Sequence, residues 1–191
     1  MTIPNKLTTI RVILVPFFVA LLLLGDRIFG SASDFIACGI FVLASITDFF
    51  DGMLARKLNQ VTNYGKFMDP LADKLLVCSA FVCLATMGRG VYAWEVVIII
   101  CREFVVSGLR LIAVEEGKVI AASIWGKAKT FVSMIAIIVV ILHLQVNIGE
   151  SFAWWYVFEQ ILMYASVILT VLSMVDYLWK NRNILKSEMG L

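Results

Sequence analysis

The sequence has little charge for its length. Only 16% of its 191 residues are Asp, Glu, Lys or Arg, whereas 61% are aliphatic, aromatic, methionine or cysteine residues. A water-soluble domain of this size needs more polar surface than this, so the composition argues against a soluble enzyme. The apolar residues number about 117, and at roughly 20 for each membrane-spanning helix they would supply roughly six spans joined by short loops.

Common signals for zinc, disulfides and nucleic acid are also missing. Histidine occurs once, as His143 in an apolar run, and the four cysteines lie in apolar stretches without a C-x-x-C pair. They predict buried side chains, with neither a disulfide framework nor a zinc site. No basic run is interleaved with aromatic residues, and the net charge is only +2, so we expect no nucleic-acid partner.

Six apolar segments lie between clusters of charged residues and glycines. They cover residues 9 to 25, 34 to 55, 70 to 88, 91 to 114, 123 to 146 and 152 to 179. This pattern predicts an all-α polytopic membrane protein with six transmembrane helices. The breaks are too short for a second domain, so residues 1–191 are predicted to form one membrane domain. The first segment also has features of a signal peptide, because Lys6 and Arg11 precede an apolar core.

The basic residues lie mostly on one side of the predicted membrane. With an even number of spans both termini share a side, and the breaks on the other side contain only Arg27 and Arg89. Arg102 lies within a segment, and the other 13 of the 16 basic residues lie at or near the first side. Because basic loops stay in the cytoplasm, we expect a multi-pass protein of the cell (plasma) membrane with both termini cytoplasmic.

Four aspartates lie where two neighbouring segments meet. Asp48 and Asp51 are at i and i+3 near the cytoplasmic end of the second segment, and Asp69 and Asp73 are at i and i+4 where the third begins. The short connection makes the two helices antiparallel neighbours, so the carboxylates can converge in an active-site cavity on the cytoplasmic side. Four carboxylates in a partly dry site need cations. Ligands that are all oxygen select Mg²⁺, Mn²⁺ or Ca²⁺, and two Mg²⁺ ions would suit a diphosphate substrate.

Each aspartate also has a structural alternative. Asp69 could cap a helix whose first residue is Pro70, and the second-segment aspartates could pair with nearby basic residues at the membrane surface. The complete pattern argues against this alternative. D-x-x-D-G-x-x-A-R begins at Asp48 and is followed, after eight residues, by G-x-x-x-D-x-x-x-D beginning at Gly65.

This pattern resembles the signature of the CDP-alcohol phosphotransferase family at every signature position, and the six-span topology is similar too. The resemblance implies that Asp48, Asp51 and Asp69 bind metal, and that Asp73 binds metal and acts as the general base. It implies two Mg²⁺ or Mn²⁺ ions and a homodimer. It also implies a nucleotide-binding set: Gly52, Ala55, Arg56 and Gly65.

Three polar tracts bear on the acceptor alcohol. Residues 4–11, 102–110 and 123–130 resemble tracts in the branch of the family that makes phosphatidylglycerophosphate. The resemblance implies CDP-diacylglycerol and sn-glycerol 3-phosphate as substrates. An anionic acceptor needs cations, and each basic side chain could instead bind the headgroups of membrane lipids. The candidates for the acceptor phosphate are Arg110, Lys127, Lys129, Thr8 and Lys66, the last two only if the N-terminal tract folds back beneath the site.

Arg102 lies deep in the fourth segment, where a charged side chain needs a partner. Adjacent residues on a helix point in different directions, so Glu103 is not expected to face Arg102 directly. An ion pair across helices and a contact within the site are both open.

Other activities would use similar residues. Serine or inositol phosphate could replace glycerol phosphate as the acceptor. A membrane prenyltransferase also holds Mg²⁺-diphosphate on aspartate pairs, but it has more spans and no use for the G-x-x-A-R element. A divalent-cation or proton-coupled transporter would use the aspartates as an ion path. It would lack a nucleotide site, and the inverted repeats expected of transporters are not visible in the sequence.

Overall fold

The computed structural model describes residues 3–30, 32–57, 63–88, 90–115, 123–143 and 152–182, and within these ranges it contains six helices and no strands. Their bounds are α1 (Ile3–Phe29), α2 (Ala32–Lys57), α3 (Asn63–Thr86), α4 (Ala93–Glu115), α5 (Ile124–His143) and α6 (Phe152–Lys180). Each predicted segment corresponds to one helix. The all-α prediction is confirmed.

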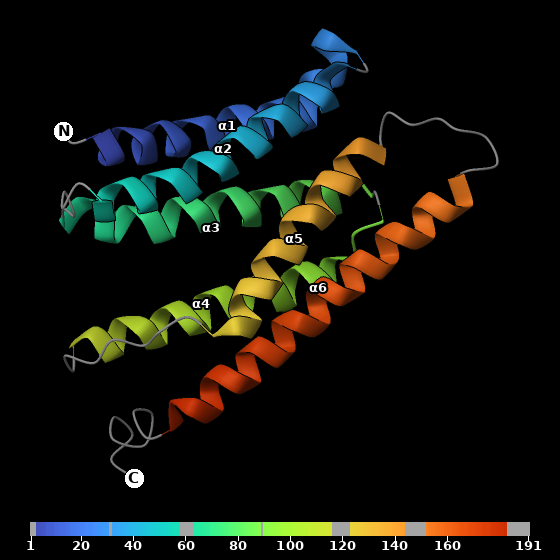
Figure 1. The fold of residues 1–191 in the computed structure, drawn as a ribbon. Helices are drawn as coiled ribbons and strands as arrows, with labels where there is room; N and C mark the ends of the chain where they lie inside the picture. Colours follow the sequence, from blue (N-terminus) through green and yellow to red (C-terminus); the bar gives the residue numbers. More distant parts are fainter. Residues whose placement is uncertain are drawn as a thin grey trace.

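The helices form a bundle in which successive elements run in opposite directions (Figure 1). α1 packs along α2 and α3, while α5 packs along α6 and also contacts α2 and α3. α4 completes the arrangement through contacts with α3 and α6. We call the end where α2 finishes and α3 begins the motif end. α4 also finishes, and α5 begins, toward this end (Figure 1).

Short polar signals set several helix ends. Gly30 adopts a left-handed φ of 57° directly after α1, a conformation that glycine adopts without strain. Glu95 Oε2 accepts a hydrogen bond from the backbone N–H of Tyr92 at 2.9 Å, as in a capping box at the start of α4. Ser123 Oγ accepts one from the backbone N–H of Gly126 at 3.1 Å and so caps α5.

An apolar core runs through the middle of the bundle. Phe18 of α1 and Phe41 of α2 are fully buried, with ring centroids 5.8 Å apart. The core continues through Phe81 of α3, Ile99 of α4 and Ile137 of α5. It therefore joins helices from both halves of the chain, and its burial favours the bundle over separate helices.

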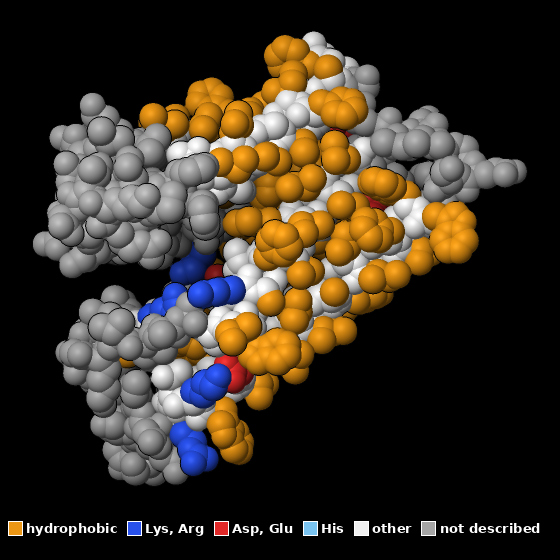
Figure 2. All heavy atoms as spheres, in the orientation of Figure 1, with side chains coloured by type: hydrophobic (Ala, Val, Ile, Leu, Met, Phe, Trp, Pro, Cys, Tyr) orange, Lys and Arg blue, Asp and Glu red, His pale blue; other side chains and the backbone are white. Residues whose placement is uncertain are grey.

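Large apolar side chains also cover the outside of the bundle. Phe131 is 67% exposed and Trp154 is 81% exposed. Over the described part of the face in Figure 2, apolar side chains predominate, and Lys and Arg gather toward the motif end. By length and composition, three described stretches could cross a membrane: Thr8–Phe29, Ile124–Leu142 and Trp154–Lys180. Shorter apolar stretches occur at Ala32–Thr47 and Lys74–Thr86. The surface and these stretches fit a polytopic membrane protein.

The structure excludes two alternatives about helix starts that the sequence left open. α3 begins at Asn63, so Asp69 and Pro70 lie inside the helix and do not form its N-cap and first residue. α1 begins at Ile3 and continues through Thr8 without a break. The N-terminal tract therefore extends the first span instead of folding back beneath the site.

Candidate active site

The signature residues occupy the two helix ends that meet at the motif end. Asp48, Asp51, Gly52, Ala55 and Arg56 lie in the last turns of α2. In α3, Gly65, Lys66, Asp69 and Asp73 lie in the first three turns. The two helices contact each other and run in opposite directions, so the backbone brings both halves of the motif to one end of the bundle.

The continuity of these helices supports the pairing of the aspartates. Asp48 and Asp51 are one turn apart on α2, and Asp69 and Asp73 are one turn apart on α3, so each pair shares a helix face. The side chains of all the signature residues, and of Lys66, lie outside the described residues. Among the described side chains there is no group of three or more His, Cys, Asp or Glu that could bind a metal ion. The four aspartates are therefore predicted metal ligands only.

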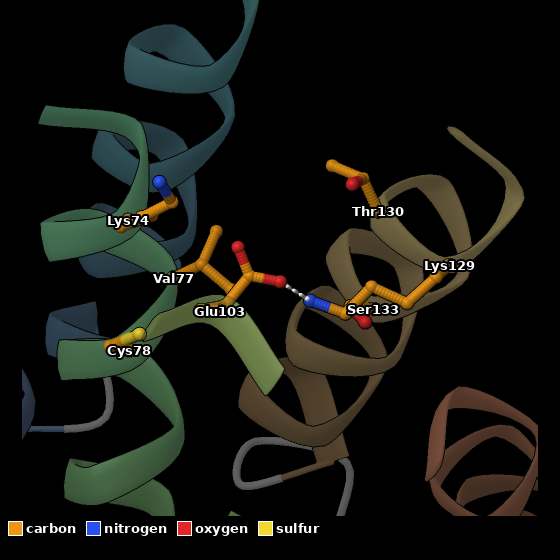
Figure 3. Close-up of a pocket in the computed structure, with 7 residues that line it drawn as sticks. All are labelled: Lys74, Val77, Cys78, Glu103, Lys129, Thr130 and Ser133. Carbon is orange, nitrogen blue, oxygen red and sulfur yellow. Dashed lines mark hydrogen bonds and ion pairs between the residues drawn. The ribbon is translucent and has the colours of Figure 1, made fainter. Parts of the chain in front are cut away.

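A pocket opens beside the motif, between α3, α4 and α5. The cavity itself measures about 20 Å³, and about 280 Å³ is reached only when the adjoining space open to solvent is counted. Its lining mixes polar and apolar side chains. Lys74, which directly follows Asp73 on α3, is part of this lining. The remaining residues are Val77 and Cys78 of α3, Glu103 of α4, and Lys129, Thr130 and Ser133 of α5 (Figure 3).

Glu103 is the centre of the charged contacts in this pocket. Its Oε1 lies 2.6 Å from Lys129 Nζ and 2.8 Å from Arg102 Nη1, so two cations share one carboxylate oxygen. The Arg102 Nη2 donates a further hydrogen bond to Ser173 Oγ of α6 at 2.6 Å. These contacts connect α4 to both α5 and α6.

The expectation that Glu103 cannot face Arg102 is wrong. The two Cα–Cβ bonds do diverge, but a long guanidinium side chain can curl back toward the carboxylate of the next residue. The partners of Arg102 are thus Glu103, its neighbour in sequence, and Ser173 on another helix. Glu103 gives the buried cation a counter-charge, and Ser173 gives it a hydrogen-bond acceptor.

Lys74 is a pocket residue that the sequence reasoning missed. Its ammonium donates a hydrogen bond to Ser107 Oγ of α4, and the Ser107 hydroxyl donates to the backbone carbonyl of Glu103. The signal was its position directly after Asp73, which places a cation next to the last signature residue. The contact links α3 to the turn of α4 that carries Glu103.

The candidates for the acceptor phosphate are not all brought together. Lys129 lines the pocket, and its side chain is only 3% exposed. The Arg110 guanidinium instead lies over the Tyr177 ring, 5.8 Å from its centroid. Lys127 is exposed and Thr8 is fully buried, and neither lines the pocket.

The fold and the signature together define a membrane-embedded transferase class. Residues 1–172 match the family model described as CDP-alcohol phosphatidyltransferase, and the chain belongs to this family.

Several relatives have more specific names. The chain is 40% identical to the CDP-diacylglycerol–glycerol-3-phosphate 3-phosphatidyltransferase of Bacillus subtilis, over 97% of this chain and 98% of that protein. It is 39% identical to the Escherichia coli protein of the same name, over 92% of each. It is 40% identical to a probable phosphatidylglycerophosphate synthase of Mycobacterium tuberculosis, over 91% of this chain and 78% of that protein.

Proposed function

We propose that this protein transfers the phosphatidyl group of CDP-diacylglycerol to sn-glycerol 3-phosphate, which yields phosphatidylglycerophosphate and CMP. The observation that carries the proposal is that relatives named for this reaction match nearly the whole chain. The placement of the complete motif on two helices that meet at one end of the bundle supports it. The reaction is a step of phospholipid biosynthesis.

The proposed metal ligands are Asp48, Asp51, Asp69 and Asp73. Their donors are all hard carboxylate oxygens on two adjacent helices, a set that suits Mg²⁺ or Mn²⁺. Two such ions, when bound, would offset the charge of the diphosphate and of the departing CMP. Without cations, four carboxylates at one end of two helices would repel each other.

Other signature residues would position the nucleotide. Arg56 presents a cation for the diphosphate. Gly52, Ala55 and Gly65 have small side chains or none, which would let the cytidine and the helix backbones approach closely.

The transfer itself is an in-line displacement at phosphorus. The acceptor hydroxyl oxygen forms a new bond to the phosphorus that carries the diacylglycerol, and the bond from that phosphorus to the CMP oxygen breaks. Asp73 would accept the hydroxyl proton as general base. No covalent intermediate with the protein is required.

The described cations favour an anionic acceptor. Lys74 and Lys129 line the pocket, and Arg102 pairs with Glu103, which is also part of its lining. Cationic side chains of this kind can pair with a phosphate, whereas the zwitterion serine carries no net charge to attract them. Arg110 and Lys127 stay candidates for guiding or binding the same phosphate, whereas the fold removes the condition on which Thr8 and Lys66 were candidates.

We also propose the setting in which the enzyme works. The distribution of Lys and Arg supports a plasma-membrane location with both termini cytoplasmic, where a lipid nucleotide and a water-soluble phosphate can meet. A homodimer is the assembly that the family resemblance implies, and chemical cross-linking in native membranes would test it.

An acceptor panel tests the function directly. The purified protein is supplied with CDP-diacylglycerol and Mg²⁺ or Mn²⁺, and CMP release is measured with sn-glycerol 3-phosphate, serine, inositol phosphate or no acceptor. We expect release only with sn-glycerol 3-phosphate. Release that favours another alcohol would reassign the acceptor, and no release with any alcohol would contradict the whole proposal.

A further inference from the structure

The contacts of Glu103 combine two features that a simple structural ion pair does not need. The carboxylate holds two cations on one oxygen, Lys129 at 2.6 Å and Arg102 at 2.8 Å. It also lines the pocket, and its side chain is 14% exposed, whereas those of Lys129 and Arg102 are 3% and 8% exposed. Glu103 thus belongs both to a buried charge network and to the pocket lining, where its carboxylate points toward Lys129 (Figure 3).

The network holds Arg102 on several sides. Ser173, fully buried, accepts a hydrogen bond from Nη2 at 2.6 Å. Gly126 leaves the space that Nη2 occupies, since a Cβ at that position would lie 3.3 Å from Nη2. A fixed Arg102 in turn holds the Glu103 carboxylate, and Glu103 sets where the Lys129 ammonium lies.

Without the ion pair to Glu103, Lys129 would be poorly suited to bind a ligand in one defined position. A lysine side chain has several freely rotating bonds and a strongly hydrated head, so it binds well only where its rotamer is already restricted. An ammonium has three N–H donors, and the hydrogen bond to Glu103 Oε1 uses one of them. Donors therefore remain for a ligand in the pocket.

We propose that Glu103 is a positioning residue for the acceptor phosphate: through its ion pairs with Lys129 and Arg102, it holds the Lys129 ammonium at the pocket between α3, α4 and α5, where that ammonium binds the phosphate of sn-glycerol 3-phosphate. This inference rests on the proposed function. It adds a carboxylate, an unexpected group beside an anionic ligand, to the residues that determine acceptor binding.

The proposal and a purely electrostatic role of Glu103 predict opposite changes in the KM for sn-glycerol 3-phosphate. If Glu103 were only a nearby negative charge, its neutralisation would strengthen binding of an anion and lower the KM for sn-glycerol 3-phosphate. If it positions Lys129, the same change frees the ammonium and raises that KM. We expect Glu103→Gln to raise the KM for sn-glycerol 3-phosphate roughly tenfold, with the KM for CDP-diacylglycerol changed less than about twofold.

Glu95→Gln is the matched control. Glu95 is a fully buried carboxylate in the first turn of the same helix, and it accepts a hydrogen bond from the Tyr92 backbone N–H, which gives it a capping role. We expect this variant to leave both KM values at the wild-type level. A lower or unchanged KM for sn-glycerol 3-phosphate in Glu103→Gln, or equal rises for both substrates, would overturn the proposal.

Two further variants keep the test decisive. Lys129→Gln should raise the KM for sn-glycerol 3-phosphate. The double variant Lys129→Gln/Glu103→Gln should raise that KM no further. If the two effects multiply instead, the residues act independently and the proposal is refuted. If Glu103→Gln does not fold, Glu103→Asp keeps the charge but withdraws it from Lys129 by one methylene. A raised KM for sn-glycerol 3-phosphate in Glu103→Asp supports the proposal, and an unchanged one contradicts it.

The wild-type control separates the two proposals. Absence of CMP release by the wild-type protein with any acceptor would contradict the proposed function. Normal wild-type release together with acceptor KM values that do not respond to Glu103 would contradict only the positioning role.

Discussion

Replacing Arg102 with methionine tests whether the buried charge network stabilises the protein as its geometry implies. The variant keeps an unbranched apolar stem of similar length but removes the guanidinium, and with it the 2.8 Å ion pair to Glu103 and the 2.6 Å hydrogen bond to Ser173. Glu103 keeps Lys129 at 2.6 Å. The change therefore breaks one side of the network and leaves the other side intact.

The expected loss in the free energy of unfolding depends on which polar groups keep a partner after the substitution. Removing one partner of a buried ion pair costs about 3–5 kcal/mol when the remaining charge is isolated. Glu103 is not isolated here, so we expect less. The fully buried Ser173 hydroxyl loses its partner, which costs about 1–3 kcal/mol, and burial of one fewer charge offsets part of that. We expect Arg102→Met to lower the free energy of unfolding by about 2 kcal/mol.

Equilibrium unfolding of the detergent-solubilised protein by sodium dodecyl sulfate, followed by circular dichroism, would measure this difference. Ser173→Ala is the companion variant, because it removes only the hydrogen-bond acceptor and should cost about 1 kcal/mol. An Arg102→Met protein as stable as the wild type, or no less stable than Ser173→Ala, would show that the ion pair to Glu103 contributes nothing to stability. The reasoning from the shared carboxylate oxygen would then be wrong.

Three further predictions concern the reaction. Asp73→Asn should abolish CMP release while CDP-diacylglycerol still binds, and unchanged turnover would remove the assignment of Asp73 as base. Chelation by EDTA should stop CMP release, and added Mg²⁺ or Mn²⁺ should restore it; activity that persists in EDTA would contradict metal dependence. Arg110→Ala should raise the KM for sn-glycerol 3-phosphate more than the KM for CDP-diacylglycerol, whereas Arg182→Ala, which removes another arginine that lies over an aromatic ring, should change neither.

The sequence was sufficient to predict the six helices and their order, because each apolar run between charged breaks became one helix. It placed the start of α3 too late. Residues 63–69 are mostly polar or small, so they do not belong to an apolar run and were predicted to form a loop. In the structure they form the first turns of α3. The Asp-Pro pair strengthened the error, since it is also typical of a helix start.

The charged contacts were harder to predict than the helices. Reasoning from Cβ directions excluded a contact between Arg102 and Glu103, because it ignored how far a guanidinium reaches around a helix. Ser173 is 71 residues from Arg102 in sequence, and no local pattern marks it as a partner. The signature motif, by contrast, could be recognised from the sequence, because its residues lie at fixed spacings along two adjacent helices.

The pocket lining has a consequence for how the acceptor could be changed. α3 contributes both Asp73 and the adjacent Lys74, so the proposed base and one wall of the pocket belong to the same helix. The opposite walls come from α4 and α5, through Glu103, Lys129, Thr130 and Ser133, and these helices carry none of the signature residues. Under the proposed function, the residues that carry out the displacement lie on α2 and α3, whereas most of the residues that would select the alcohol lie on α4 and α5. Substitutions on α4 and α5 alone should be able to retune the enzyme toward another acceptor while the displacement machinery stays as it is.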